Sequence, residues 1–206
     1  MRILASIVIL VAALSFVRPH VRRMLALEEV AVRRAGDPTT PPTRLPNSAE
    51  HFSPWEDLEQ LDISELRKAR QRIDVAMYSF TDRRLAEVIN ELATRLVEIR
   101  VYRDQEQFQD EERAAVRFGE PSTTQLFRGR PTIRVRVKQG SVRDLMHEKA
   151  FCIDGHMLRE GSANWSRSGL LVQDNNAHYS SDATDTERFE KAFEKMWDRR
   201  DNLVIQ

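Results

Sequence analysis

Short apolar segments that favour β-strands alternate with longer segments of helical periodicity across residues 57–200. The expected strands cover residues 73–80, 98–103, 132–138, 150–153 and 157–160, and the expected helices cover residues 57–72, 81–96, 105–116 and 186–200. Helices that alternate with strands along a chain pack against the faces of the sheet that those strands build. The alternation therefore predicts an α/β fold in which helices flank a mixed sheet.

Side-chain periodicity assigns faces to several of these segments. In segment 132–138, Ile133, Val135 and Val137 share one face, and basic side chains share the other. Thr81 is expected to cap the helix over 81–96, and Leu96 is expected to be the last member of its apolar face. The helix over 186–200 carries one apolar stripe that we expect in the core, formed by Phe189, Ala192, Phe193, Met196 and Trp197.

The N-terminus begins with a run without charge at residues 3–17, flanked on both sides by arginine. As a helix, these 15 residues would span about 22 Å, against a hydrocarbon core about 30 Å thick. The run predicts a retained single-pass membrane anchor within residues 1–34, with its basic flank on the cytoplasmic side of a bacterial inner membrane. A signal peptide with Ala13 and Ser15 before its cleavage site, leading to export, is the main alternative, and a buried helix is another.

A proline-rich stretch follows this run. Residues 35–56 contain five of the eight prolines of the chain, among Thr, Ser, Asn and Gly. Proline keeps a chain extended and denies it a helix, so we expect a linker here. The predicted organisation is an anchor or signal segment at 1–34, a linker at 35–56 and one folded domain at 57–206.

Charge and cysteine content exclude several classes of protein. Residues 1–34 hold six arginines and two glutamates, so the other 172 residues carry 26 basic and 30 acidic groups, a net charge of −4. That balance argues against a strongly basic nucleic-acid-binding domain, although a local basic patch stays open. The single cysteine, Cys152, rules out an intrachain disulfide and a multi-cysteine zinc site. Because it alternates away from the face of His147 and Lys149, we expect it in the core.

The spacing of five polar residues predicts a site built on a β-hairpin. If His147 begins a strand, Lys149 emerges beside it, because side chains two residues apart point the same way. Asp154 falls at the following turn, where its carboxylate can hold the turn backbone or steady a cation. The return strand brings Ser162 and Asn164 back beside His147.

These residue types suit one kind of chemistry. An imidazole supplies a nucleophile, an ammonium group supplies a fixed positive charge, and a hydroxyl and an amide supply neutral hydrogen bonds. Together they suit attack on a phosphodiester, whose oxygens gain negative charge in the transition state. The residues contain no plausible ligand set for a metal ion, so we expect neither a metal nor another cofactor.

The same residues carry a family resemblance. The signature H-x-K-x4-D-x6-G-S-x-N is matched without a gap by His147, Lys149, Asp154, Gly161, Ser162 and Asn164. The chain thus resembles the phospholipase D superfamily over about residues 52–200. Residues 73–82 also look like the first strand and turn of its single-motif branch, which includes small bacterial endonucleases and mitochondrial phospholipase D-like nucleases. The resemblance implies a phospholipase D-like sandwich with one motif per chain.

The resemblance also implies a mechanism and an assembly. The motif histidine, His147, attacks phosphorus to form a covalent phosphohistidine, a second histidine protonates the leaving alcohol, and water releases the product without a metal ion. Because this chain has one motif, a two-fold homodimer with a shared active site is expected to supply the second His147. The catalytic residues implied are His147, Lys149, Asp154, Ser162 and Asn164.

One position departs from the family pattern. The family often has a glutamate eleven residues after the motif asparagine, where it orients the nucleophilic histidine, and Asn175 stands there in this chain. The segment Gln173-Asp174-Asn175-Asn176 contains the candidates for that role, through an amide or through a shift of one residue to Asp174. His156 in the hairpin turn and His178 on a later strand are expected to be structural.

The substrate stays open between nucleic acid and phospholipid. Arg134, Arg136 and Lys138 lie on one face of a strand and are candidates for binding a nucleic-acid backbone, with a merely solvated face as the alternative. A phospholipid substrate would require a membrane, to which the N-terminal segment would attach the chain. A dimeric scaffold without catalysis is a third, weaker hypothesis, because the motif is complete.

Overall fold

The computed structural model describes residues 47–141 and 143–205. The chain divides into two units, Met1–Leu45 and Pro46–Gln206, and the fold given below is that of the second. The predicted anchor at 1–34 and most of the predicted linker lie outside the described residues. Within the described part of the chain, no helix has the length and apolar character needed to span a membrane.

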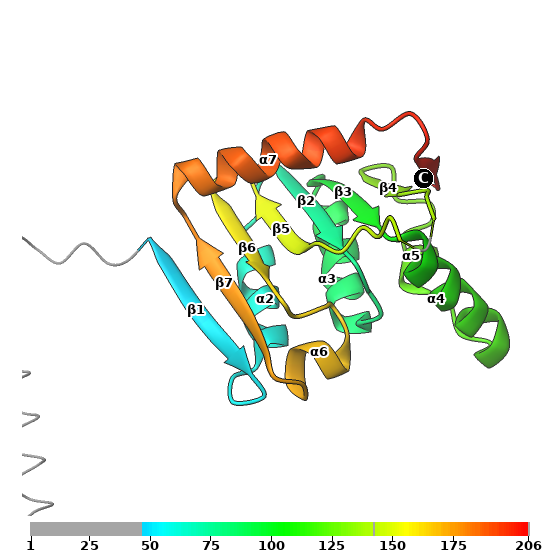
Figure 1. The fold of residues 1–206 in the computed structure, drawn as a ribbon, viewed down its shortest axis with the longest axis horizontal. Coiled ribbons are helices and arrows are strands. Elements are labelled where there is room, and N and C mark those ends of the chain that lie inside the picture. Colours follow the sequence, from blue (N-terminus) through cyan, green and yellow to red (C-terminus); the bar gives the residue numbers. More distant parts are fainter. Residues whose placement is uncertain (1–46, 142, 206) are drawn as a thin grey trace, which may run out of the picture. The chain divides into compact units, whose positions relative to one another are not determined.

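One mixed sheet organises the described residues (Figure 1). Its eight strands follow the order β1-β7-β6-β5-β2-β3-β4-β8. Strands β2, β3 and β4 run parallel, and the other neighbouring pairs are antiparallel. The strand bounds are Ser48–Ser53 (β1), Arg72–Met77 (β2), Glu98–Arg103 (β3), Ile133–Val137 (β4), Lys149–Ile153 (β5), Met157–Gly161 (β6), Asn175–Ser180 (β7) and Leu203–Val204 (β8). The predicted α/β fold with a mixed sheet is confirmed.

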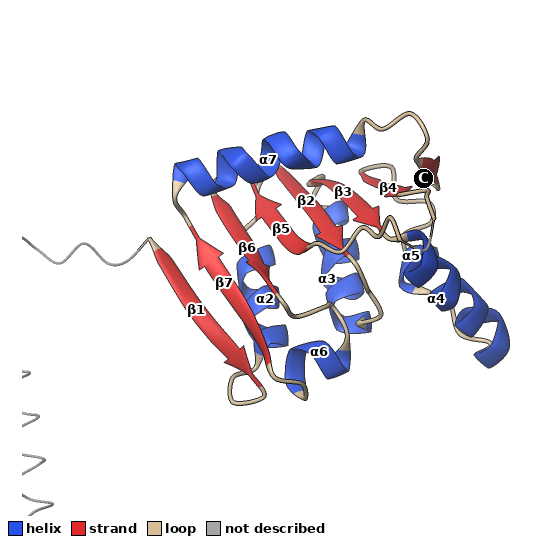
Figure 2. Cartoon of the chain, viewed as in Figure 1, coloured by secondary structure: helices blue, strands red, loops and turns tan. Residues whose placement is uncertain are grey.

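Helices cover both faces of this sheet (Figure 2). Helix α7 crosses one face, α2, α3 and α6 lie against the other, and α4 with the short α5 lies beyond the carboxyl ends of the parallel strands. The helix bounds are Leu58–Leu66 (α2), Arg83–Thr94 (α3), Gln105–Phe118 (α4), Thr123–Leu126 (α5), Arg167–Leu171 (α6) and Ala183–Trp197 (α7). The expected arrangement of helices on both faces is therefore confirmed.

Apolar side chains form a core on each face of the sheet. The larger core lies under α2, α3 and α6, where the Phe80 and Trp165 rings meet edge to face with centroids 4.7 Å apart. The smaller core contains Phe193 and Trp197 of α7, so the predicted stripe is confirmed at these two positions. Ala192 is exposed, so its placement in the core is wrong.

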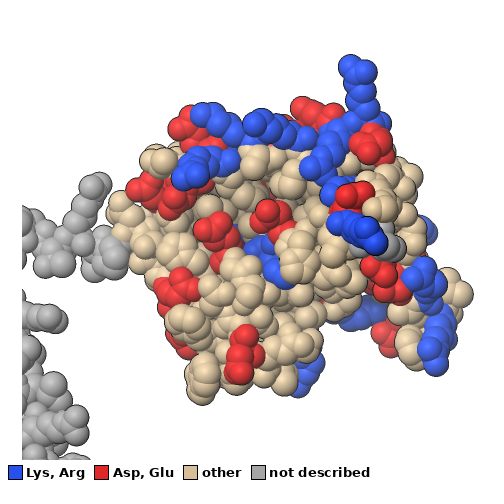
Figure 3. All heavy atoms as spheres, viewed as in Figure 1, with Lys and Arg blue, Asp and Glu red and all other residues tan. Residues whose placement is uncertain are grey.

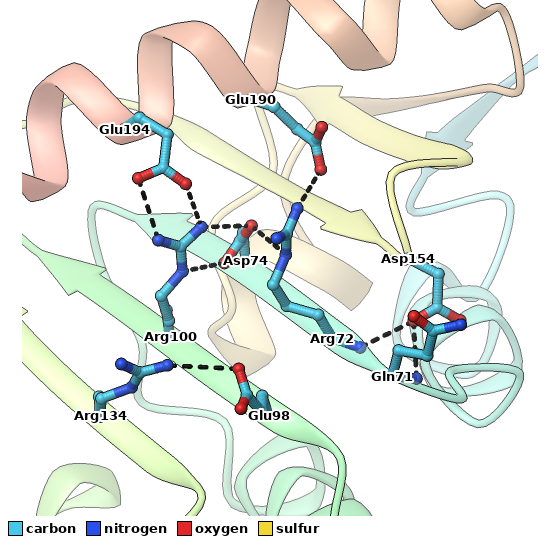
Figure 4. A network of polar contacts seen from close by, with 9 residues as sticks. All are labelled: Gln71, Arg72, Asp74, Glu98, Arg100, Arg134, Asp154, Glu190 and Glu194. Atoms are coloured by element: carbon cyan, nitrogen blue, oxygen red, sulfur yellow. Dashed lines mark hydrogen bonds and ion pairs between the residues drawn. The ribbon is translucent and has the colours of Figure 1, made fainter.

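Ion pairs fix α7 to the sheet (Figure 4). The Arg100 guanidinium on β3 donates to both carboxylate oxygens of Asp74 on β2, at 2.6 and 2.8 Å, and to Glu194 on α7 at 2.7 Å. Arg72 forms an ion pair with Glu190 one turn earlier on α7. The buried charges of Asp74 and Arg100 are thus paired with each other, as buried charges require.

The predicted linker boundary is wrong. Residues 48–53, assigned to a linker, form β1, which pairs antiparallel with β7 along its whole length. Proline cannot donate a ladder hydrogen bond, but Pro46 and Pro54 lie outside this strand, and β1 is at the edge of the sheet. The folded domain therefore begins near residue 47 and not at residue 57.

Both ends of α3 also differ from prediction. Asp82 and not Thr81 caps α3, because the Asp82 carboxylate accepts a hydrogen bond from the Leu85 backbone N–H at 3.0 Å. Leu96 lies beyond the end of α3 with a φ of 63° and is 78% exposed. The loop that leads into β3 has turned it away from the buried face.

Candidate active site

His147 and Lys149 lie at the start of β5, beside the end of β2. The two strands are antiparallel neighbours, with Met77 opposite Lys149, so the carboxyl end of β2 meets the amino end of β5. The Tyr78 backbone N–H donates to the Glu148 carbonyl at 2.8 Å, which extends the ladder one residue further. His147 itself precedes the strand by two residues, so the prediction that it begins the strand is corrected to Lys149.

The Tyr78 ring joins the two motif side chains. Its centroid lies 4.6 Å from that of the His147 imidazole, and the Lys149 ammonium nitrogen lies 4.7 Å from the centre of the same ring. The ammonium group also donates to the His147 carbonyl at 2.8 Å. His147 is exposed, whereas Lys149 is only 8% exposed. The site thus presents an accessible imidazole next to a held positive charge, and Tyr78 is a site residue that sequence reasoning missed.

Burial lowers the pKa of Lys149, because the charged form is desolvated. The carboxylates of Glu148 and Asp104 act in the opposite direction by attracting the ammonium group. The cation is therefore lost at a lower pH than that of an ordinary lysine.

The hairpin returns the second half of the motif to the same place, as predicted. Strand β6 pairs antiparallel with β5 with Phe151 opposite Arg159, and this register carries residues 161–164 back past Lys149. The Asn164 side-chain oxygen accepts a hydrogen bond from the Ser79 backbone N–H at 3.2 Å. Because the oxygen is held in this way, the amide NH2 group is oriented as a donor.

Asn175 positions the serine of the motif. The Ser162 hydroxyl donates to the Asn175 side-chain oxygen at 2.9 Å, and the Asn175 NH2 group donates to the Gly169 carbonyl at 3.0 Å. The Asn176 backbone N–H donates to the Ser162 hydroxyl at 3.0 Å. Asn175 therefore orients the Gly161–Asn164 arm, and a role for Asn175 or Asp174 in orienting His147 stays a prediction.

Asp154 lies at the other end of β5 (Figure 4). Its two carboxylate oxygens accept backbone hydrogen bonds from Arg70, Gln71 and Arg72 at 2.9, 2.8 and 2.8 Å. Hydrogen bonds from these backbone groups lower its pKa against the effect of burial, which is the largest single influence and raises it. Of the two roles expected for Asp154, the structure supports the one of holding backbone. Its role as a catalytic residue, which the resemblance implies, stays a prediction.

A buried ion pair lies beneath the motif. The Arg159 guanidinium donates to the carbonyls of Lys149 and Ala163 at 3.0 and 3.1 Å, so one side chain links the two arms of the hairpin. It also donates to the Asp62 carboxylate at 3.2 Å, and both side chains are completely buried. Sequence reasoning missed this pair.

Two aromatic residues complete the surroundings of Asp62. The Tyr179 hydroxyl and the Trp165 indole N–H donate to its carboxylate at 2.6 and 2.9 Å. Burial raises the pKa of Asp62, and the nearby Arg159 cation opposes that rise. Asp62 thus holds Arg159 in place below β5 and the Gly161–Asn164 arm.

The predicted substrate-binding residues separate in the structure. Arg134 pairs with Glu98 at the start of β3, which is the end of the parallel strands opposite Tyr78. The Arg136 guanidinium lies over the Trp197 ring at 4.6 Å, under α7. Lys138 alone of the three follows the carboxyl end of β4, where it donates to the Leu145 carbonyl at 3.2 Å. Arg134 and Arg136 are therefore not brought to the site, which corrects that prediction.

The structure also shows where Cys152 and His178 lie. Cys152 is buried on the α7 side of β5, as expected, and burial raises the pKa of its thiol to about 12. The His178 ring nitrogen Nδ1 lies 2.8 Å from the Glu50 carboxylate on β1, which is consistent with a structural role.

One known protein family matches the part of the chain that contains both the central strands and the motif. The family described as "Cardiolipin synthase, PLD-like domain" matches residues 63–197, which include β2, the hairpin and α7. The chain belongs to this phospholipase D-like family. The resemblance inferred from the motif is confirmed.

Individual phospholipase D-like relatives agree with this assignment. The mitochondrial cardiolipin hydrolase of Chlamydomonas reinhardtii is 26% identical over 136 residues, which are 66% of this chain and 56% of that protein. The chain therefore spans little more than half of its curated relative.

Two solved structures share the fold. NucT from Helicobacter pylori has a TM-score of 0.62 and 22% identity, and covers 73% of this chain and 94% of its own. Nuc from Salmonella typhimurium, a phospholipase D family member, has a TM-score of 0.66 and 18% identity, and covers 77% of this chain and 97% of its own. At these identities the likeness concerns the fold.

Proposed function

We propose that this chain is a phosphodiesterase in which His147 forms a covalent phosphohistidine. The observation that carries the proposal is the cluster at the end of β2 and β5, where an exposed imidazole lies beside a largely buried ammonium group. A nucleophile needs access to phosphorus, and a cation out of bulk water acts more strongly on the phosphoryl oxygens. The Asn164 amide, held through its oxygen by Ser79, supplies a neutral donor to the same oxygens.

Two steps complete the reaction. A His147 ring nitrogen attacks phosphorus, a P–N bond forms, and the bond to the leaving alcohol breaks as a second, protonated histidine gives its proton to that oxygen. Water then attacks phosphorus, the same histidine takes a proton from the water, and the P–N bond breaks to release the phosphomonoester. The reaction requires one histidine to start neutral, as the nucleophile, and the other to start protonated, as the acid.

The second histidine is proposed to come from a homodimer with a shared active site. His178 is held by Glu50 on the β1 side of the sheet, so it is a poor donor to a group at His147. A second copy of the chain would supply its own His147 across a two-fold axis.

Activity should therefore depend on the dimer. Dilution below the dimer dissociation constant is expected to lower specific activity, because a monomer lacks the general acid. Light scattering at working concentration should give twice the chain mass of 24.0 kDa. A stable monomer with full turnover would contradict the shared site and point to an acid within the chain.

Replacing Lys149 by arginine should shift the pH profile. A lysine is cationic below its pKa, and burial lowers that pKa, so kcat/KM should fall on the alkaline side at a lower pH than an ordinary lysine would give. In Lys149→Arg the cation persists to higher pH, so the part of the alkaline fall that Lys149 causes should move upward. A profile identical in both proteins would show that the Lys149 charge does not set this limb.

The substrate is proposed to be either a phospholipid or a nucleic acid. Lysine and arginine alternate with acidic side chains on the face shown in Figure 3, without one continuous basic surface there. The net charge of −4 over residues 35–206 favours the phospholipid over the nucleic acid, whose binding depends strongly on a basic surface. A membrane anchor within residues 1–34, on the cytoplasmic side or after export, is a further proposal that would bring the domain to lipid.

A parallel assay of the full chain on phospholipid vesicles, single-stranded DNA and RNA tests these alternatives. We include EDTA, because in residues 47–141 and 143–205 no three His, Cys, Asp or Glu side chains are grouped to hold a metal ion. Cleavage of one substrate class in EDTA is expected. Loss of activity that zinc or magnesium restores would contradict the proposed chemistry, and no cleavage of any substrate would favour a scaffold.

A further inference from the structure

A cavity of about 630 Å³ lies next to the proposed active site. One wall is the inner side of α4, and the other is formed by the loop after β2 and by residues 120–123 before α5. A volume of this size is typical of a pocket for a small organic group. None of the motif residues lines this cavity.

Two residues connect the cavity to the motif. Ser79 lines it, and the Ser79 backbone N–H holds the Asn164 amide. Gln107 lines it as well, and its amide donates to the Tyr78 hydroxyl at 3.3 Å, whose ring contacts His147 and Lys149. A phosphodiester at His147 can therefore extend one of its two ester substituents into this cavity.

The walls combine apolar surface with negative charge. Ala114, Ala115 and Phe118 of α4 line the cavity, and Phe118 is 69% exposed, although it is a large apolar residue. Three carboxylates, those of Asp110, Glu111 and Glu120, also line the cavity. Glu120 pairs with Arg83, which carries the single guanidinium of the lining, and Asp110 pairs with Arg113 outside it. Buried Arg103 pairs with Glu111 from behind the wall. The lining therefore offers apolar surface to a ligand, and its one cation, Arg83, is already engaged by Glu120 and is not free to bind a second phosphate.

We propose that this cavity binds one ester substituent of the substrate, an alcohol group with an apolar part and no phosphate of its own. This inference rests on the proposed function and deepens it. A nucleic acid carries a phosphate on every nucleotide, so its next phosphate would enter a lining of paired carboxylates that has no free cation for it. A lipid-like diester places carbon chain against Ala114, Ala115 and Phe118 and needs no such cation.

Symmetric phosphodiesters test the proposal, because either substituent can then enter the cavity. Calorimetry gives the Kd of the full chain for diethyl phosphate and dihexyl phosphate. Dihexyl phosphate should bind about tenfold or more tightly, the scale expected when methylene groups enter an apolar pocket. Ala115→Trp should remove most of that preference by filling the cavity, and Ala114→Trp serves as a second variant. Val116→Trp is the control, because Val116 is 84% exposed and outside the lining.

A second comparison tests the charge. The dinucleotide TpT should bind more tightly than pTpTp, which carries additional terminal phosphates, and Asp110→Lys should narrow that difference, whereas Gln109→Lys on the outer side should not. Equal Kd values for the two alkyl diesters, an unchanged preference in both tryptophan variants, or tighter binding of pTpTp would each overturn the cavity assignment. Cleavage of bis(p-nitrophenyl) phosphate is measured separately, so failure of the proposed function is distinguishable from failure of the cavity.

Discussion

His147→Ala is expected to lower phosphodiester cleavage by at least about 10³-fold, because the substitution removes the proposed nucleophile and leaves nothing to form the covalent intermediate. The imidazole is exposed and its ring contact is with Tyr78, so the folded structure should persist. Steady-state turnover of wild type and variant on the same diester measures the effect, and circular dichroism checks the fold.

The matched control is His156→Ala. His156 is exposed in the turn between β5 and β6, at the far end of the strand from the motif histidine, so this variant should keep wild-type turnover. A folded His147→Ala protein with turnover near wild type would show that another group attacks phosphorus.

The second large effect concerns stability. Asp62→Ala should lower the free energy of unfolding by about 3–5 kcal/mol, because it leaves the fully buried Arg159 guanidinium without its counter-charge. The Tyr179 hydroxyl and Trp165 indole would lose their acceptor as well. Urea unfolding followed by fluorescence measures the difference.

A surface pair provides the control for this experiment. Asp198 lies 3.8 Å from Arg136 and is largely exposed, so Asp198→Ala should change stability by no more than about 1 kcal/mol. If the two variants unfold at the same urea concentration, the buried pair does not hold the hairpin as described.

Much of the fold follows from short-range pattern. Strand segment 98–103 has the bounds of β3, and the hairpin around Asp154 forms where the motif spacing places it. These features depend on residues near in sequence, where the alternation of side chains decides which face each one joins. The relation between His147, Lys149 and Asn164 could be predicted for the same reason, because one hairpin carries all three.

What could not be predicted depends on distant partners. Asp62 resembles any charged residue of a surface helix, and only the fold brings Arg159, 97 residues away, against it. Similarly, the basic face of β4 looked open to solvent, but α7 places Trp197 over Arg136. The pairing of β1 with β7 joins segments more than 120 residues apart, and prolines on both sides concealed it.

The covalent intermediate gives the most direct test of the central claim. The full chain is mixed with a phosphodiester, quenched rapidly in alkali during turnover, digested, and mapped by mass spectrometry. We expect an adduct on His147 that carries the phosphoryl group with the retained alcohol, stable in alkali and lost in acid, as a P–N bond requires. An adduct on Ser162 instead, or turnover without any adduct on His147, would contradict that claim.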